Sequence, residues 1–158
     1  MANNIVIDGG RIIFRNFSGK PTRFTKEGVR TFCLVLDNPE YVEMLKEDGW
    51  NVKTLPPRNP DDDPLNYISV SVNYDNFPPK IYLVTSQKKT LLDEDTVSVL
   101  DYAELAHVDL VIRPYTWEVN GKSGVKAYLK TMYATVVEDE FENKYRDLTD
   151  EEEEVPFN

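Results

Sequence analysis

The chain is poor in the residue types that most often carry chemistry. Among its 158 residues it has one cysteine, Cys33, and one histidine, His107. A single cysteine excludes an internal disulfide and a multi-cysteine zinc site. Cys33 lies in the apolar run 32–36, which predicts a buried, inert thiol rather than a nucleophile. A serine or cysteine triad would have only His107 as its base, with no nucleophile motif nearby, so we expect this histidine to be structural or on the surface.

Sites for metals, phosphates and membranes are lacking too. The acidic runs 61–63 and 93–95 lie in predicted loops without the spaced ligands of a calcium loop, and they are typical of solvated turns. There is no glycine loop of the P-loop type. No apolar run approaches the ~20 residues that span a bilayer, and residues 1–10 do not have the pattern of a secretory leader. We therefore expect a cytoplasmic protein that is not an enzyme and holds no cofactor or metal.

The negative charge is concentrated at one end. The formal net charge is -10, and residues 138–158 hold ten acidic and two basic side chains. The rest of the chain has 18 acidic and 16 basic side chains, with basic excess in 1–36 and 113–130. A nearly neutral body with two basic stretches can bind phosphate on one face, even where the whole chain is acidic.

Hydrophobic patterning predicts a mainly β fold. Alternation and β-branched runs indicate strands over 5–17, 29–37, 50–55, 67–74, 80–86, 107–119 and 125–137. A glycine pair inside the first strand predicts a bend, and residues 88–106 are expected to be a loop with a short helix. Residues 38–49 have helix signals, with Asn38 as the cap, Gly49 as the stop, and Tyr41, Leu45 and Met44 as the inward face. Six or seven strands with one short helix favour an OB-like small twisted β-barrel.

The last two strands form the most informative part. Asn-Gly at 120–121 predicts a tight turn and a long C-terminal hairpin. Side chains alternate faces along a strand, so one face of the hairpin is predicted to point into the core. Its residues are Val108, Leu110, Ile112, Val125, Ala127 and Leu129. The opposite face combines aromatic and basic side chains: Arg113, Tyr115, Trp117, Lys126, Tyr128 and Lys130. Single-stranded nucleic acid needs this pair of types, since rings stack on bases and cations neutralise phosphates. Lys122, in the connecting loop, is a further candidate.

The first basic stretch has the same character. Candidates for DNA contact lie on the first two strands and the loop between them: Arg15, Phe17, Lys20, Arg23, Phe24 and Arg30. Phe14 and Phe32 are expected in the core. An alternative stays open for the hairpin, because Trp117 and Tyr128 could cover a second small core or a subunit interface.

The chain ends in an acidic segment. Residues 147–158 read DLTDEEEEVPFN, and five carboxylates at 150–154 repel one another, so we expect a disordered tail after a domain spanning 1–146. The apolar tip Val155, Pro156 and Phe157 suits capture in a pocket with a basic rim, or competition with DNA for the protein's own groove. A plain solubility tail is the alternative.

The ending EEEEVPFN resembles the acidic tip of bacterial single-stranded DNA-binding proteins, which recruits replication and repair proteins. The segments RNFSGKPTRF and RPYTWEVNGKSGVKAYLKTMY resemble phage and prophage proteins of the same functional group. The resemblance implies an OB fold, sequence-independent binding of single strands, and roles in DNA replication and recombination in the host cell cytoplasm. It also implies that Val155, Pro156 and Phe157 form the partner-binding tip. Because Asn158 follows Phe157, recognition by the host's tail-binding proteins is an open point.

Together these features predict a non-catalytic protein whose partner is single-stranded DNA, with possible homo-oligomers and possible replication or recombination partners at the tail. A rival hypothesis is a phage assembly or protein-interaction module that uses the hairpin as an interface. A metal-dependent nuclease is a third hypothesis. It is disfavoured because the sequence lacks a pattern of acidic residues that would bind the catalytic metal ions.

Overall fold

The computed structural model describes residues 3–23, 26–75 and 78–137. In these ranges, the chain forms the following elements: β1 (Ile5–Gly10), β2 (Ile12–Asn16), β3 (Arg30–Leu36), α1 (Pro39–Glu47), β4 (Val52–Leu55), β5 (Leu65–Val72), β6 (Lys80–Val84), β7 (Lys89–Leu92), the 3₁₀ helix η1 (Val97–Asp101), β8 (Leu105–Val119) and β9 (Lys122–Val136). The predicted domain boundary at residue 146 and the predicted tail 147–158 lie outside the described residues.

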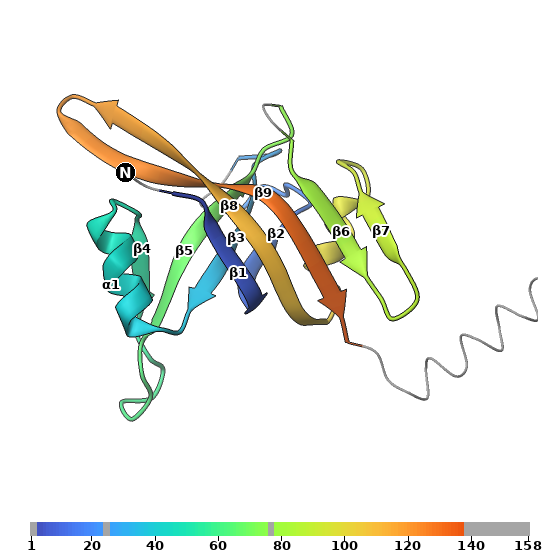
Figure 1. The fold of residues 1–158 in the computed structure, drawn as a ribbon, viewed down its shortest axis with the longest axis horizontal. Helices are drawn as coiled ribbons and strands as arrows, with labels where there is room; N and C mark the ends of the chain where they lie inside the picture. Colours follow the sequence, from blue (N-terminus) through green and yellow to red (C-terminus); the bar gives the residue numbers. More distant parts are fainter. Residues whose placement is uncertain (1–2, 24–25, 76–77, 138–158) are drawn as a thin grey trace, which may run out of the picture.

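The main sheet returns on itself. Its strand order is β1-β8-β9-β5-β3-β2, and only Arg11 separates β1 from β2 along the chain. The two ends of the order are therefore two halves of one bent strand (Figure 1). Gly9 has a φ of +70° and the register with β8 shifts between Ile7 and Gly10, which confirms the predicted bend. Because β5 and β9 run parallel and all other neighbours on this path run antiparallel, the topology is OB-like, as predicted.

The core fills the inside of this curved sheet. The six hairpin positions predicted as core are all buried, at 7% exposure or less. β9 has a bulge directly after Leu129. Ile112 pairs with Leu129 and Val111 pairs with Thr131, which leaves Lys130 as an extra residue on β9. Beyond the bulge the buried positions of β9 are Met132 and Ala134.

Two phenylalanines with the same prediction have different environments. Phe32 is fully buried, as expected, whereas Phe14 is 59% exposed, so that prediction is wrong. Phe14 has a φ of +51° at a register irregularity between β2 and β3, and its ring meets Tyr67 edge-on. The irregular backbone turns the side chain away from the core.

Helix α1 begins and ends where its sequence signals lie. The Asn38 side chain accepts hydrogen bonds from the backbone N–H groups of Glu40 and Tyr41, and Gly49 follows the helix with a φ of +94°. Val42 and Leu45 are buried, whereas Met44 is 47% exposed and is not part of the inward face.

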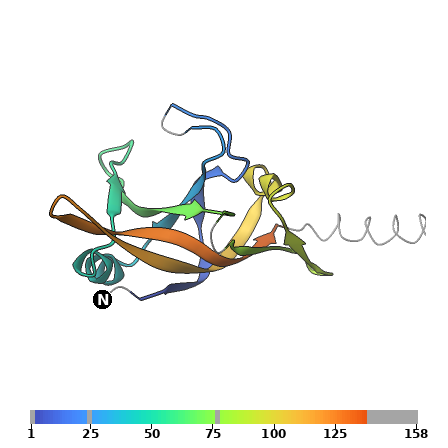
Figure 2. The ribbon, with the colours of Figure 1, turned by 90° about the horizontal axis from the view of Figure 1, so that it is seen from above.

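Strand β7 was not expected from the sequence. The segment 88–106 contains the predicted short helix as η1, together with β7 and the start of β8. Within the described part of the chain β7 pairs only with β6, and β6 pairs with β9 beyond the end of β5, so this small hairpin extends the sheet at one side (Figure 2). Among the helices of the described ranges, none has the length and apolar character to cross a membrane.

Candidate nucleic-acid interface

The long hairpin of β8 and β9 places aromatic and basic side chains on its outer face. Asn120 and Gly121 both have positive φ and close a two-residue turn, so the hairpin is confirmed, but its loop is shorter than the predicted 120–124 and Lys122 begins β9. The register sets Arg113 opposite Tyr128, Tyr115 opposite Lys126, and Trp117 opposite Gly124. The predicted alternation of faces is therefore confirmed by the pairing.

Tyr128 is the centre of a compact cluster. The Tyr115 ring approaches it edge-on, with centroids 6.0 Å apart at 88°. The guanidinium carbon of Arg113 lies 5.4 Å from the Tyr128 centroid, and Nζ of Lys126 lies 5.1 Å from it. Cations held against an aromatic ring remain able to meet a phosphate, so a base on the ring and its phosphate could be bound together.

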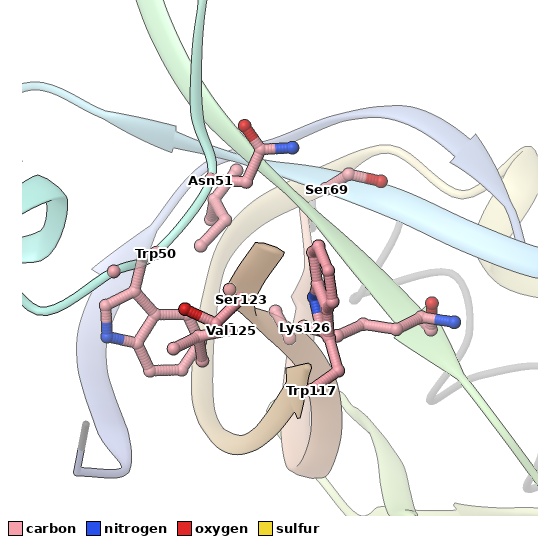
Figure 3. Close-up of a pocket in the computed structure, with 12 residues that line it drawn as sticks. Trp50, Asn51, Ser69, Trp117, Ser123, Val125 and Lys126 are labelled. Carbon is pink, nitrogen blue, oxygen red and sulfur yellow. The ribbon is translucent and has the colours of Figure 1, made fainter. Parts of the chain in front are cut away.

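Trp117 stands at the head of a groove. Its indole packs on Gly124, where a built Cβ would lie only 2.8 Å from Cζ2 of the ring, and the side chain is 39% exposed. The groove has a volume of about 550 Å³. It lies between the hairpin and the segment after α1 (Figure 3), and it is lined by Gly49, Trp50, Asn51, Ile68, Ser69, Ser71, Trp117, Ser123, Gly124, Val125, Lys126 and Ala127.

A second depression continues the first. It has a volume of about 420 Å³ and shares Ser71 and Lys126 with the groove at Trp117. Its other lining residues are Tyr128 of β9 and residues from the end of the β2–β3 connection, the start of β3, the end of β5 with the segment after it, and the loop after β7. The two depressions form one trough over β5 and β9, between the β2–β3 connection and the β8–β9 hairpin. OB folds bind oligonucleotides on the corresponding strand face, between the corresponding loops.

The floor of the trough was not predicted from the sequence. Ser69 and Ser71 point out of β5 while Ile68, Val70 and Val72 are buried. The alternation in YISVSVNY contained the signal, because small polar residues on one face of a central strand leave room for a ligand. Trp50 at the groove wall is only 4% exposed, and its position behind a helix-ending glycine gave no hint of this role.

Tyr74 lines the second depression and was also missed. Burial raises its pKa to about 12. The guanidinium carbon of Arg30 lies 5.4 Å from its ring centroid. Its hydroxyl is buried, and no described residue hydrogen-bonds to it.

Three predicted contact residues have structural roles instead. Phe17 is fully buried and stacks on Phe32 with centroids 5.3 Å apart, so the prediction of an exposed stacking ring is wrong. The chain leaves β2 at Asn16, where the register with β3 shifts, and this irregularity turns Phe17 inward. Arg15 donates hydrogen bonds to the backbone oxygens of Leu100 and Ala103, at 2.8 and 2.6 Å.

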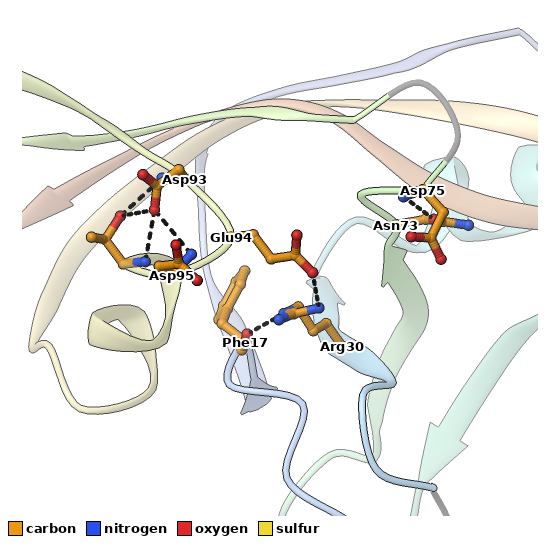
Figure 4. A network of polar contacts seen from close by, with 8 residues as sticks. Phe17, Arg30, Asn73, Asp75, Asp93, Glu94 and Asp95 are labelled. Carbon is orange, nitrogen blue, oxygen red and sulfur yellow. Dashed lines mark hydrogen bonds and ion pairs between the residues drawn. The ribbon is translucent and has the colours of Figure 1, made fainter.

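Arg30 is likewise engaged within the protein. Its Nε donates to the Phe17 carbonyl oxygen at 3.0 Å, and its NH1 lies 3.5 Å from a carboxylate oxygen of Glu94 (Figure 4). The side chain is 17% exposed. Arg30 therefore lines the trough but is held by partners that a phosphate would have to replace.

The other cationic candidates are exposed. Lys20, Arg23, Lys122 and Lys130 lie on the surface. The Lys20 ammonium donates to the Tyr102 hydroxyl, which raises the pKa of Lys20. The remaining candidates lie outside the described residues: Phe24, Val155, Pro156 and Phe157. In the described ranges, His, Cys, Asp and Glu side chains form no group of three that could hold a metal ion.

The trough, its aromatic side chains and its cations point to single-stranded nucleic acid, and comparison with known families agrees. Residues 1–156 match the model of the phage ssDNA-binding domain. The chain belongs to this family of phage single-stranded DNA-binding proteins. Family membership favours the DNA-binding hypothesis over the assembly-module hypothesis. No curated protein matches the chain.

Solved structures of one phage protein have the same fold. The single-stranded DNA-binding protein from bacteriophage Enc34, in complex with ssDNA, is 14% identical with a TM-score of 0.55, over 86% of this chain and 88% of that chain. A C-terminal truncation of the Enc34 protein is 15% identical with a TM-score of 0.55, over 86% and 87%. The single-stranded DNA-binding protein gp2.5 of bacteriophage T7 is 11% identical with a TM-score of 0.42, over 87% and 88%. The Enc34 likeness bears out the predicted OB-like fold.

Proposed function

We propose that this family member binds single-stranded DNA in the trough between the β8–β9 hairpin and the β2–β3 connection, without altering it chemically. The observation that supports this most directly is the trough itself, with Trp117 at one end and the Tyr128 cluster along its wall. Bases would stack on Trp117, Tyr115 and Tyr128. The solved complex of the Enc34 protein with ssDNA, on a shared fold, supports the same ligand class.

Phosphates would follow the cations along the trough. Lys126 lies in both depressions, and the β2–β3 connection and β9 carry four further exposed cations, Lys20, Arg23, Lys122 and Lys130. Stacking and phosphate contacts are common to all bases, so binding would be independent of sequence. A protein of this kind would serve phage DNA replication and recombination in the host cytoplasm.

The acidic segment 147–158 would compete with DNA for this cationic trough. It carries six acidic and no basic side chains, so its removal changes the formal net charge from -10 to -4. Val155, Pro156 and Phe157 would recruit replication or recombination proteins when DNA displaces the segment. Autoinhibition of this kind weakens as salt screens the charges.

Fluorescence anisotropy of a labelled oligo-dT tests both proposals. The full chain should bind more weakly as salt rises, with a slope of about -0.7 in log K per phosphate contact. A 1–146 truncation should bind severalfold more tightly at low salt, with the difference shrinking at high salt. Absence of binding by both proteins would refute DNA binding in the trough, and weaker binding by the truncation would refute only competition by the tail.

A further inference from the structure

A second aromatic and basic cluster lies outside the trough, on β6, β7 and β9. The rings of Tyr82 and Tyr133 stack with centroids 5.0 Å apart and planes 9° from parallel. Nζ of Lys89 lies 4.9 Å from the Tyr82 centroid and 5.4 Å from the Tyr133 centroid. This Tyr82–Tyr133–Lys89 cluster has the same chemistry as the Tyr128 cluster, but its two rings are stacked face to face, whereas Tyr115 meets Tyr128 edge-on.

The cluster faces outward, on the same side of β9 as Tyr128. Tyr82 pairs with Tyr133 across β6 and β9, while their neighbours Ile81, Met132 and Ala134 are buried. The bulge at Lys130 shifts the alternation by one residue, which keeps both Tyr128 and Tyr133 on the outer face. Five residues of strand separate the two tyrosines by roughly 16 Å.

Cations fill the interval between the two clusters. A depression of about 450 Å³ lies there, lined by Pro78, Lys80, Arg113, Lys130 and Thr131. Arg113 also contacts the Tyr128 ring, so this depression begins at the cluster that lines the trough. A strand leaving the trough at Tyr128 would therefore meet three cationic side chains before reaching Tyr133.

Acidic side chains on one side of Tyr133 indicate which way a DNA strand would continue past the cluster. On the β1 side of Tyr133, a shallow depression is lined in part by Asp8 and Asp109, which would repel phosphates. On the β7 side the cluster ends in Lys89, which is an exposed residue. The charge distribution thus favours a path from the trough over β9 toward β6 and β7.

We propose that the Tyr82–Tyr133–Lys89 cluster is a second stacking platform, which extends the single-stranded DNA site beyond the trough. This inference rests on the proposed function. The stacked pair presents a preformed π-face with a cation beside it, and these are the contacts that unpaired bases and their phosphates require. If the pair served only to join β6 to β9, it would contribute about 0.2–1 kcal/mol to folding and nothing to binding.

The test compares oligo-dT of about 8 and about 16 nucleotides, the middle and upper end of the range bound by single OB folds. The full chain is compared with Lys89→Ala and with the double variant Tyr82→Leu/Tyr133→Leu. Lys46→Ala on α1 is the charge-matched control, because Lys46 is exposed and far along the chain from both clusters. Thermal melting checks that each variant is folded.

We expect both variants to bind the short oligonucleotide as the unaltered protein does. For the longer one, the double variant should bind about tenfold more weakly, and Lys89→Ala should reduce the salt slope by about 0.7. Unchanged binding of both lengths by both variants would refute the platform alone. Equal weakening for both lengths would also overturn it as an extension, since the cluster would then belong to the primary site. Binding of neither length by the unaltered protein would refute the proposed function, and the platform with it.

Discussion

Removing the Trp117 indole is the most direct perturbation of the trough. The ring packs on Gly124 on one side and borders the groove on the other, and the side chain is 39% exposed. Trp117→Ala would leave the buried hairpin positions in place, so the protein should still fold, with a loss of about 2–3 kcal/mol from the buried part of the ring. Because the variant stays folded, a loss of DNA affinity would then come from the lost stacking surface and not from unfolding.

The expected loss of affinity follows from base stacking. Alanine substitution of a stacking ring costs about 1–3 kcal/mol per base, which corresponds to a roughly 5- to 150-fold rise in Kd. Tyr128→Ala should cost a similar amount, and more if Arg113 and Lys126 lose their positions against its ring. Because a stacking ring carries no net charge, the salt slope of Trp117→Ala should match that of the unaltered protein.

Substitution of Gly124 tests whether DNA binding needs the Trp117 indole in its observed position, since the indole itself is retained. In Gly124→Ala the new Cβ would lie 2.8 Å from the Trp117 ring, so the indole must swing away from its place on β9. Anisotropy with oligo-dT should show weaker binding by Gly124→Ala, although it retains every aromatic residue. Met44→Ala on α1 serves as the control for loss of an exposed apolar side chain.

If Trp117→Ala and Tyr128→Ala both bind DNA like the unaltered protein, the hairpin is not the binding surface.

Three further predictions test the neighbouring features. Glu94→Gln removes the carboxylate that lies 3.5 Å from Arg30 in the trough, so DNA binding should tighten severalfold, and the free energy of unfolding should fall by less than about 1 kcal/mol. The control Glu43→Gln on α1 should bind DNA as the unaltered protein does. Weaker binding by Glu94→Gln would contradict this prediction. Phe17→Ala should lower the free energy of unfolding by about 3–5 kcal/mol in urea titrations, and a change below 1 kcal/mol would contradict a core position. Burial raises the pKa of the Cys33 thiol, so at pH 8 it should react with Ellman's reagent far more slowly than in denaturant; equal rates would show an accessible thiolate.

Regular periodicity made the hairpin predictable. Along β8 and β9 each buried residue is followed by an outward one, and Asn120-Gly121 marks the turn, so the two faces of the hairpin could be inferred from the sequence. The same alternation could not reveal the Lys130 bulge, because an extra residue is set by pairing across strands rather than by local sequence. The bulge is what places Tyr133 on the outer face beside Tyr82.

Predictions failed where the backbone is irregular. Phe14 and Phe17 lie three residues apart at the end of β2, where the register with β3 shifts, and the expected exposure of the two rings is reversed. Arg15 and Arg30 were expected to be available for phosphate, but their partners are backbone oxygens and Glu94, from segments distant in sequence. Such partners are set by the fold, so a basic residue on a strand cannot be assigned to DNA contact from its neighbours alone.

An acidic protein can bind DNA in this trough because the relevant potential is local. Of the net charge of -10, residues 138–158 account for -8, and the segment 113–130 that forms most of the hairpin carries four basic and one acidic side chain. Phosphates lying within a Debye length of Lys126 and Lys130 experience mainly those cations, since charges more than about 8 Å away are largely screened at physiological salt. Under the proposed competition, the acidic segment would therefore oppose binding only by occupying the trough, and its effect should depend on its attachment to the chain more than on the total charge. Added as a separate peptide at a concentration equal to that of the protein, residues 147–158 should inhibit the 1–146 truncation much less than they inhibit the full chain to which they are joined.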